Sequence, residues 1–286
     1  MNPPGYPALA PPPAPERPKR RRWLSAIVAV WALVVAGVAV WSVRHDPPTV
    51  PEQRSIADAL PVFRQALGAT VAAADGPDRA VEIAAPRFDR DCALTPVRAG
   101  VEASQEVTVR VRADQAPVVL DSIARALPKA YRPTIRHDAE NTRHVLRADA
   151  GEFVGVDATA DNGSTVFALR VSTGCRPVAA GVDLDPTPRA ATAVPPAFAA
   201  AMKALGARAP ATSVEVACPN GKTAATVVAT GLPARPNLGA ALRDAVAGAF
   251  VVQADPHAWA YRAGEVSVMV SDSGGSARVS ATTTCR

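Results

Sequence analysis

The chain has 286 residues, of which 48% are hydrophobic and 20% charged, a composition typical of a globular protein. Its net charge is +5, but residues 1–22 hold +4 of this charge, so the rest of the chain is nearly neutral. Because a nearly neutral body cannot neutralise many phosphates, we expect no nucleic-acid partner.

A basic, proline-rich segment opens the chain and an uncharged apolar run follows it. A helix over residues 23–43 would span about 31 Å, which is enough for one bilayer crossing. Basic residues before the run and tryptophans near its two ends are the topology signals: Arg17, Lys19, Arg20, Arg21, Arg22, Trp23 and Trp41. The sequence predicts a single-pass cell-membrane protein that contacts the lipid bilayer through residues 23–43, with a cytoplasmic N-terminus and an extracytoplasmic C-terminal part.

The alternative to this signal-anchor is a secretory signal peptide that is cleaved after residue 39. Gly37-Val38-Ala39 offers the small residues that such a cleavage site needs. The apolar run is longer than the roughly 7 to 15 residues of a usual signal-peptide core, which favours the anchor. Both alternatives place residues 45–286 outside the cytoplasm.

Two segments after residue 55 resemble each other in the order of their elements. Residues 56–176 and 197–286 each begin with an apolar helix ending in Leu-Gly-Ala, continue with two strands, and then show a second amphipathic helix after a proline. Three short strands follow in each, and both segments end in Thr-x-Cys-Arg. The sequence therefore predicts an α+β fold with a single N-terminal transmembrane helix and two tandem αββαβββ repeats, each an antiparallel-rich sheet packed against two helices.

The strands of the repeats are predicted from apolar runs and the turns between them. Residues 146–148 and 150–156 are expected to be strands, with a counterpart at 260–262 and 263–270. Asn162-Gly163 is expected to be a hairpin turn, since the turns that join antiparallel strands favour residues with positive φ.

The predicted organisation has six parts. They are a cytoplasmic tail (1–22), a transmembrane helix (23–43), a juxtamembrane linker (44–55), a first repeat (56–176), a proline-containing linker (177–196) and a second repeat (197–286). Because the linker between the repeats has prolines and no periodicity, we expect two lobes with some freedom that fold independently.

Four cysteines fall two to a repeat, in a part of the chain expected to face an oxidising compartment. Four cysteines allow three pairings, and the duplication selects Cys92–Cys175 and Cys218–Cys285. In our comparison of the repeats Ala85 takes the place of Cys218, and Cys92 lies seven residues later. Since no Cys-x-x-Cys spacing occurs, we expect disulfides and no zinc.

Three short segments resemble known functional motifs but lack the other residues that the chemistry of those motifs needs. Gly221-Lys222-Thr223 ends like a phosphate-binding loop, yet Val216 stands where its first glycine belongs and a strand-like run follows. Asp272-Ser273-Gly274-Gly275 is similar to the nucleophile loop of trypsin-like serine proteases, whose other motifs are missing. We interpret both segments as turns.

A third pattern gathers possible metal ligands. His137, Asp138, Glu140 and His144 fall within eight residues, and a loop could bring two imidazoles and a carboxylate around a metal. Their spacing fits no helical face, so we interpret the segment as a solvated polar loop. We expect no catalytic residue, no metal ligand and no cofactor.

These predictions lead to a functional hypothesis that rests on elimination. We expect a non-enzymatic, membrane-anchored binding module that holds an envelope protein, a polymer or a small ligand where its two repeats meet. The alternatives are an extracytoplasmic enzyme with an unrecognised site and a structural spacer of the envelope. A cleft in which Glu152 and Glu265 converge with His137 would favour the enzyme.

Overall fold

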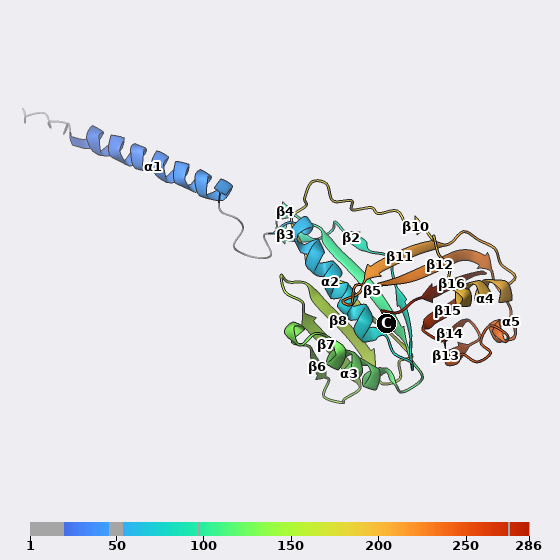
Figure 1. The fold of residues 1–286 in the computed structure, drawn as a ribbon. Coiled ribbons are helices and arrows are strands. Elements are labelled where there is room, and N and C mark those ends of the chain that lie inside the picture. The colour runs from blue at the N-terminus through green and yellow to red at the C-terminus, as the bar shows by residue number, and fades with distance from the viewer. Residues whose placement is uncertain (1–19, 46–53, 97, 274, 286) are drawn as a thin grey trace, which may run out of the picture. The chain divides into compact units, whose positions relative to one another are not determined.

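The computed structural model describes residues 20–45, 54–96, 98–273 and 275–285. The chain divides into two compact units, Met1–Thr49 and Val50–Arg286, which we treat separately. Figure 1 shows the helix of the first unit and the helices and sheets of the second.

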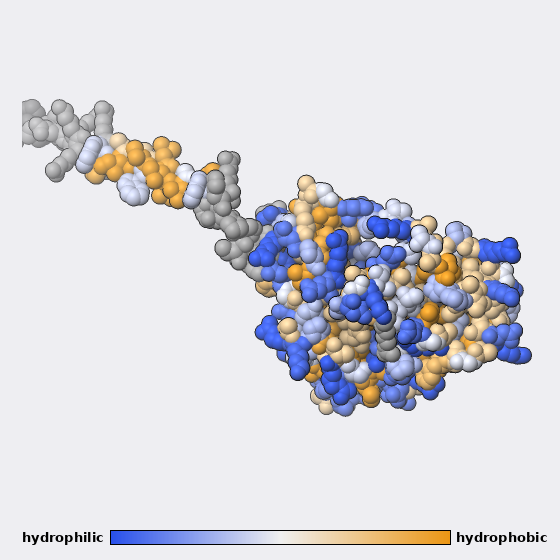
Figure 2. Space-filling model, in the orientation of Figure 1, coloured by the Kyte–Doolittle hydropathy of each residue, from blue (hydrophilic) through white to orange (hydrophobic). Residues whose placement is uncertain are grey.

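The first unit consists of helix α1 (Arg20–His45). Its stretch Trp23–Trp41 is the one helical segment in the described part of the chain that is long and apolar enough to cross a membrane. Figure 2 shows this segment as a nearly continuous run of apolar residues. The helix fits a membrane anchor or a signal sequence, as the composition predicts.

The second unit begins with a first half built on one antiparallel sheet. Helices α2 (Ile56–Ala74) and α3 (Ala116–Ala126) pack on this sheet. Its strand order is β1-β5-β9-β8-β7-β6, and β2 also pairs with β5. The bounds are β1 (Ala80–Ile83), β2 (Arg87–Asp89), β5 (Glu102–Arg110), β6 (Thr134–His137), β7 (Arg143–Asp149), β8 (Gly155–Asp161) and β9 (Val166–Ser172). A separate hairpin is formed by β3 (Ala93–Thr95) and β4 (Arg98–Ala99), and a short 3₁₀ helix covers Lys129–Tyr131.

The second half is built on another antiparallel sheet, with strand order β10-β11-β12-β16-β15-β14-β13. Helix α4 (Pro196–Ala204) packs on β15 and β16, and α5 (Leu238–Leu242) packs on β14. The bounds are β10 (Arg189–Ala190), β11 (Thr212–Ala217), β12 (Thr223–Pro233), β13 (Phe250–Asp255), β14 (Ala258–Ala263), β15 (Val266–Ser273) and β16 (Ser276–Thr282). The α+β fold with antiparallel sheets agrees with the prediction.

Local sequence explains where the two long helices begin. Ser55 and Asp58 form a capping box at the start of α2, in which the Ser55 N–H donates to Asp58 Oδ2 at 3.1 Å. Pro117 lies in the first turn of α3, where a missing N–H costs nothing. The buried positions Leu120 and Ile123 of α3 face the sheet.

The strand count after the second helix differs from the prediction, because each half has four strands there instead of three. The short strands β6 and β13 were missed, since both have too little apolar alternation to stand out. The prediction of a strand over 150–156 is also wrong in its first part. Glu152 and Phe153 have φ values of 53° and 57°, and the Ala150 N–H donates to the Val154 carbonyl, so residues 150–154 form a turn.

The two halves are not separate lobes, because they share a hydrophobic core. Val216, Cys218, Ala224 and Cys285 of the second half are buried in the cluster formed by the first half. The segment between the halves also packs on this core, through the partly buried Ala179, Val182 and Leu184. Prolines and the lack of periodicity indicate an irregular segment, but they do not indicate whether it packs.

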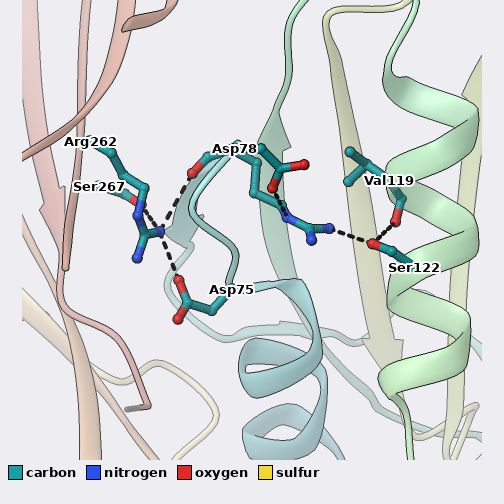
Figure 3. A network of polar contacts seen from close by, with 7 residues as sticks. Asp75, Asp78, Val119, Ser122, Arg262 and Ser267 are labelled. Atoms are coloured by element: carbon teal, nitrogen blue, oxygen red, sulfur yellow. Dashed lines mark hydrogen bonds and ion pairs between the residues drawn. The ribbon is translucent and has the colours of Figure 1, made fainter. Parts of the chain in front are cut away.

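Two ion pairs also join the halves, and one of them is buried. Arg262 on β14 donates to Asp75, just after α2, at 2.7 Å, and their side chains are only 4% and 5% exposed. Figure 3 shows Arg262 pointing from the second sheet toward Asp75, with Ser267 beside it. On the neighbouring strands, Arg278 donates to both carboxylate oxygens of Glu82 at 2.7 and 2.8 Å. Strand β1 is therefore held against the second sheet by charge as well as by packing.

The cysteines form two disulfides, Cys92–Cys175 and Cys218–Cys285, with Cα–Cα distances of 5.8 and 5.6 Å. These separations are normal for a disulfide. Each bridge closes within one half, which is the pairing that the sequence predicts.

Candidate functional site

A hollow in the second unit lies where its two halves meet. A cavity of about 570 Å³ is bounded by α2, by β2 and β5 of the first sheet, by residues 181–189, and by β11 of the second sheet. A smaller hollow of about 310 Å³ shares several of its lining residues. We call the two together the junction groove.

The floor of the junction groove is apolar. Leu60 and Leu67 come from one side of α2, because residues seven apart on a helix share a face. Phe88 of β2 is half-buried, and Val214 and Val216 reach the groove from β11. Apolar residues from both halves thus line one cavity, which places the groove at the junction rather than within either half.

Charged groups stand around this floor. Arg64, Arg189 and Glu215 line both hollows, and their side chains are exposed. None of the three forms an ion pair or side-chain hydrogen bond with another described residue. Their charges therefore remain available to a ligand, which is the ordinary chemistry of a binding groove with a few polar groups on an apolar surface.

A buried amide adds a polar group to the groove. Gln105 on β5 is 5% exposed, and its Nε2 donates to the Ala84 carbonyl at 2.7 Å. Gln105 lines the larger hollow, and this hydrogen bond through Nε2 leaves its Oε1 oxygen able to accept another one.

The residues predicted to set membrane topology lie on or before α1. Arg17 and Lys19 fall outside the described residues, while Arg20, Arg21 and Arg22 form the first turn of α1. Trp23 and Trp41 are exposed at the two ends of the apolar stretch. The structure describes no orientation for this helix relative to a bilayer.

The two histidines of the possible metal cluster meet, but the carboxylates do not join them. His137 and His144 are cross-strand partners on β6 and β7, with their Nδ1 atoms 2.7 Å apart. Asp138 instead closes the loop, and hydrogen bonds from the Thr142 hydroxyl and the Arg143 N–H lower the pKa of its carboxyl. Among the described residues, no group of three or more His, Cys, Asp or Glu side chains is placed to hold a metal.

The first motif fragment lies in a turn, as interpreted from the sequence, whereas Asp272 and Ser273 of the second belong to strand β15. Gly221 has φ of 80°, and the Cys218 N–H donates to the Lys222 carbonyl, which closes a turn between β11 and β12. Asp272 lies at the end of β15, and its carboxylate contacts Nδ1 of the exposed His257 at 3.3 Å. The helix N-terminus that a phosphate-binding loop requires is replaced by a strand.

The convergence that would have favoured an enzyme is not found. Glu152 pairs with Arg54 at 2.6 Å, whereas His137 bonds to His144. Glu265 lies in the turn between β14 and β15 of the other half. In the portion of the chain that the structure describes, these three side chains form no cluster.

Sequence reasoning did not identify the residues of the junction groove. They come from five separate segments, and none of those segments carries a recognisable binding motif. Comparison of the chain with protein-family models, with curated proteins and with solved structures gave no match.

Proposed function

We propose that this protein is a single-pass, membrane-anchored extracytoplasmic binding module, and that it holds its ligand in the junction groove. The observation that carries the proposal is the set of uncompensated charges, Arg64, Arg189 and Glu215, around an apolar floor. Asp183 is a second exposed carboxylate that lines the larger hollow, so the groove carries two guanidinium groups and two carboxylates. This set suits a ligand that combines an apolar part with acidic and basic groups. A segment of an envelope protein or a polymer with charged substituents meets this description.

The proposed location has two supports. The basic residues that precede the apolar stretch Trp23–Trp41 favour a cytoplasmic N-terminus by the positive-inside rule. The second unit contains two disulfides, which persist in oxidising compartments outside the cytoplasm. Protease added to intact cells should digest the second unit, and protection of that unit from external protease would contradict this orientation.

We also propose that the two halves arose by tandem duplication. Their sheets are connected alike, since β1, β5, β6, β7, β8 and β9 correspond in order to β11, β12, β13, β14, β15 and β16. The threonines of the two Thr-x-Cys-Arg segments support this origin. Thr173 exchanges backbone and side-chain hydrogen bonds with Ala103 on β5, and Thr283 does the same with Ala225 on β12.

The pairing registers explain why the early cysteines look displaced in sequence. Strand pairing places Arg87, Ser104 and Ser172 side by side across three adjacent strands of the first sheet. Val214, Thr226 and Thr282 lie side by side in the same way in the second sheet. Cys92 lies five residues after Arg87, and Cys218 lies four residues after Val214. If the halves are duplicates, β2 therefore matches the part of β11 that is nearest to Cys218. In this alignment Cys92 and Cys218 are offset by one residue instead of seven.

The binding proposal can be tested with a defined probe. Anilinonaphthalene sulfonate joins an apolar ring system to an anionic group, so it should bind the groove and gain fluorescence. Replacing both groove arginines (Arg64→Glu and Arg189→Glu) should weaken binding by about tenfold or more, since each lost charge-assisted contact is worth about 1.5 kcal/mol.

The matched control is Arg136→Glu, which reverses an exposed charge on β6 away from the groove. The control should bind the probe like the unaltered protein. Equal probe binding by the groove variant and the unaltered protein would contradict the assignment of the groove as the ligand site.

A further inference from the structure

The His137–His144 pair has a geometry that packing alone does not require. His144 is 6% exposed on β7, and its partner on β6 is exposed. The ring centroids are 4.7 Å apart, with an interplanar angle of 81°. The two Nδ1 atoms are 2.7 Å apart and share a hydrogen bond at one edge of the first sheet.

Hydrogen bonds fix which nitrogen of His144 carries its proton. The Asn162 Nδ2 donates to the Asn141 carbonyl at 3.0 Å, which turns Oδ1 of the same amide toward His144. His144 Nε2 lies 2.8 Å from this oxygen, and because an amide oxygen only accepts, Nε2 must be the protonated nitrogen. Nδ1 of neutral His144 therefore presents a lone pair to His137.

We propose that His137 and His144 form a copper(II) site through their Nδ1 atoms. The second ring nitrogen of His144 already donates to an oriented amide oxygen, which is the arrangement that fixes metal-binding histidines in proteins. The exposed His137 ring rotates and carries its proton on Nε2 when Nδ1 binds the ion. Water molecules fill the remaining positions of the ion, since Asp138 is committed to its own loop.

Rotation of the exposed His137 ring breaks the hydrogen bond between the two Nδ1 atoms and lets both lone pairs converge on one ion. With metal–nitrogen bonds of about 2.0 Å, the two nitrogens then lie about 2.8 Å apart around a square-planar ion. Square-planar nitrogen coordination is typical of Cu²⁺, which also has the highest affinity for such ligands among first-row divalent ions.

The test is a titration of the full chain in detergent micelles with copper(II) chloride alone. We expect one equivalent to bind, with an electron paramagnetic resonance spectrum that shows two equatorial imidazole nitrogens. His137→Ala removes an exposed side chain and should weaken binding by at least about tenfold, as should Asn162→Ala through loss of the orienting oxygen.

The matched control is His257→Ala, since His257 is another exposed histidine whose side chain is 77% accessible. It should leave the affinity unchanged. Because His144 is buried, its substitution would also disturb packing, so the test does not use it. Unchanged copper affinity in His137→Ala, or a spectrum without two imidazole nitrogens, would overturn the proposal and would leave the binding function of the groove untouched.

Discussion

The hydroxyl group of Tyr261 is a buried polar group without a hydrogen-bond partner among the described residues. The side chain is fully buried in the core of the second half. An unpaired buried hydroxyl costs about 1 to 3 kcal/mol of stability. Tyr261→Phe keeps the ring and removes the hydroxyl, so it should raise the free energy of unfolding by about 1 kcal/mol in urea denaturation. A clear loss of stability would show that the hydroxyl has a partner.

The same residue predicts an alkaline response. Burial raises the pKa of Tyr261 from 10.0 to about 12. Because its pKa is raised in the folded state, the contribution of Tyr261 to the free energy of unfolding is complete below pH 10. This contribution is lost as the pH rises toward 12. At pH 11 the loss should reach about 1.4 kcal/mol. Tyr261→Phe should lack this loss, and equal alkaline slopes for the two proteins would refute the assignment.

Helix α2 and strand β11 approach each other at Gly68, and this contact joins the two halves. A Cβ atom at Gly68 would lie 2.1 Å from the Ala217 carbonyl oxygen, which is too close for any real contact. Helix propensity alone predicts that Gly68→Ala stabilises α2 by about 1 kcal/mol. The contact predicts the opposite sign, a loss of about 2 kcal/mol or more, because backbone on both sides must move.

Thermal or urea unfolding shows whether Gly68→Ala raises or lowers the stability of the second unit. Gly163→Ala is the control, since a Cβ there meets no atom within 4 Å and its φ is not positive. The control should change stability by less than about 0.5 kcal/mol. Stabilisation by Gly68→Ala would mean that α2 and β11 do not pack as the structure places them.

The elements that sequence reasoning identified are those with a strong local signal. The period of the apolar residues indicated α3, and Asn162-Gly163 indicated the turn between β8 and β9. Strands β6 and β13 carry little apolar alternation, so they were missed. At residues 150–154 the apolar run suggested a strand, but Ala150 and Val154 close a turn on each other. Local pattern does not show where a backbone hydrogen bond closes within a segment.

At the scale of the whole molecule, the disulfide pairing was predictable and the association of the halves was not. The pairing follows from the order of elements along the chain. The shared core depends on Val216 and Ala224 facing the first half, and the strand pattern does not tell which partner a face meets. Arg262 and Asp75 are 187 positions apart, and either one alone looks like an ordinary surface charge. The junction groove was hidden for the same reason.

The shared core predicts that the second unit unfolds as one. Removing the Cys218–Cys285 bridge by Cys218→Ser and Cys285→Ser opens a loop with a sequence separation of 67, which should cost about 4 kcal/mol in the chain-entropy account. Because both cysteines lie in the core shared with the first half, the loss should appear in both halves.

Hydrogen exchange measured by mass spectrometry reads each half separately. Amides of β5 and β9 should lose protection together with those of β12 and β16 when the Cys218–Cys285 bridge is absent. The variant with Cys92→Ser and Cys175→Ser is the matched comparison, and it should reduce protection in the same four strands. If each variant affects only its own half, the halves unfold independently, and the contact of α2 with β11 does not couple them.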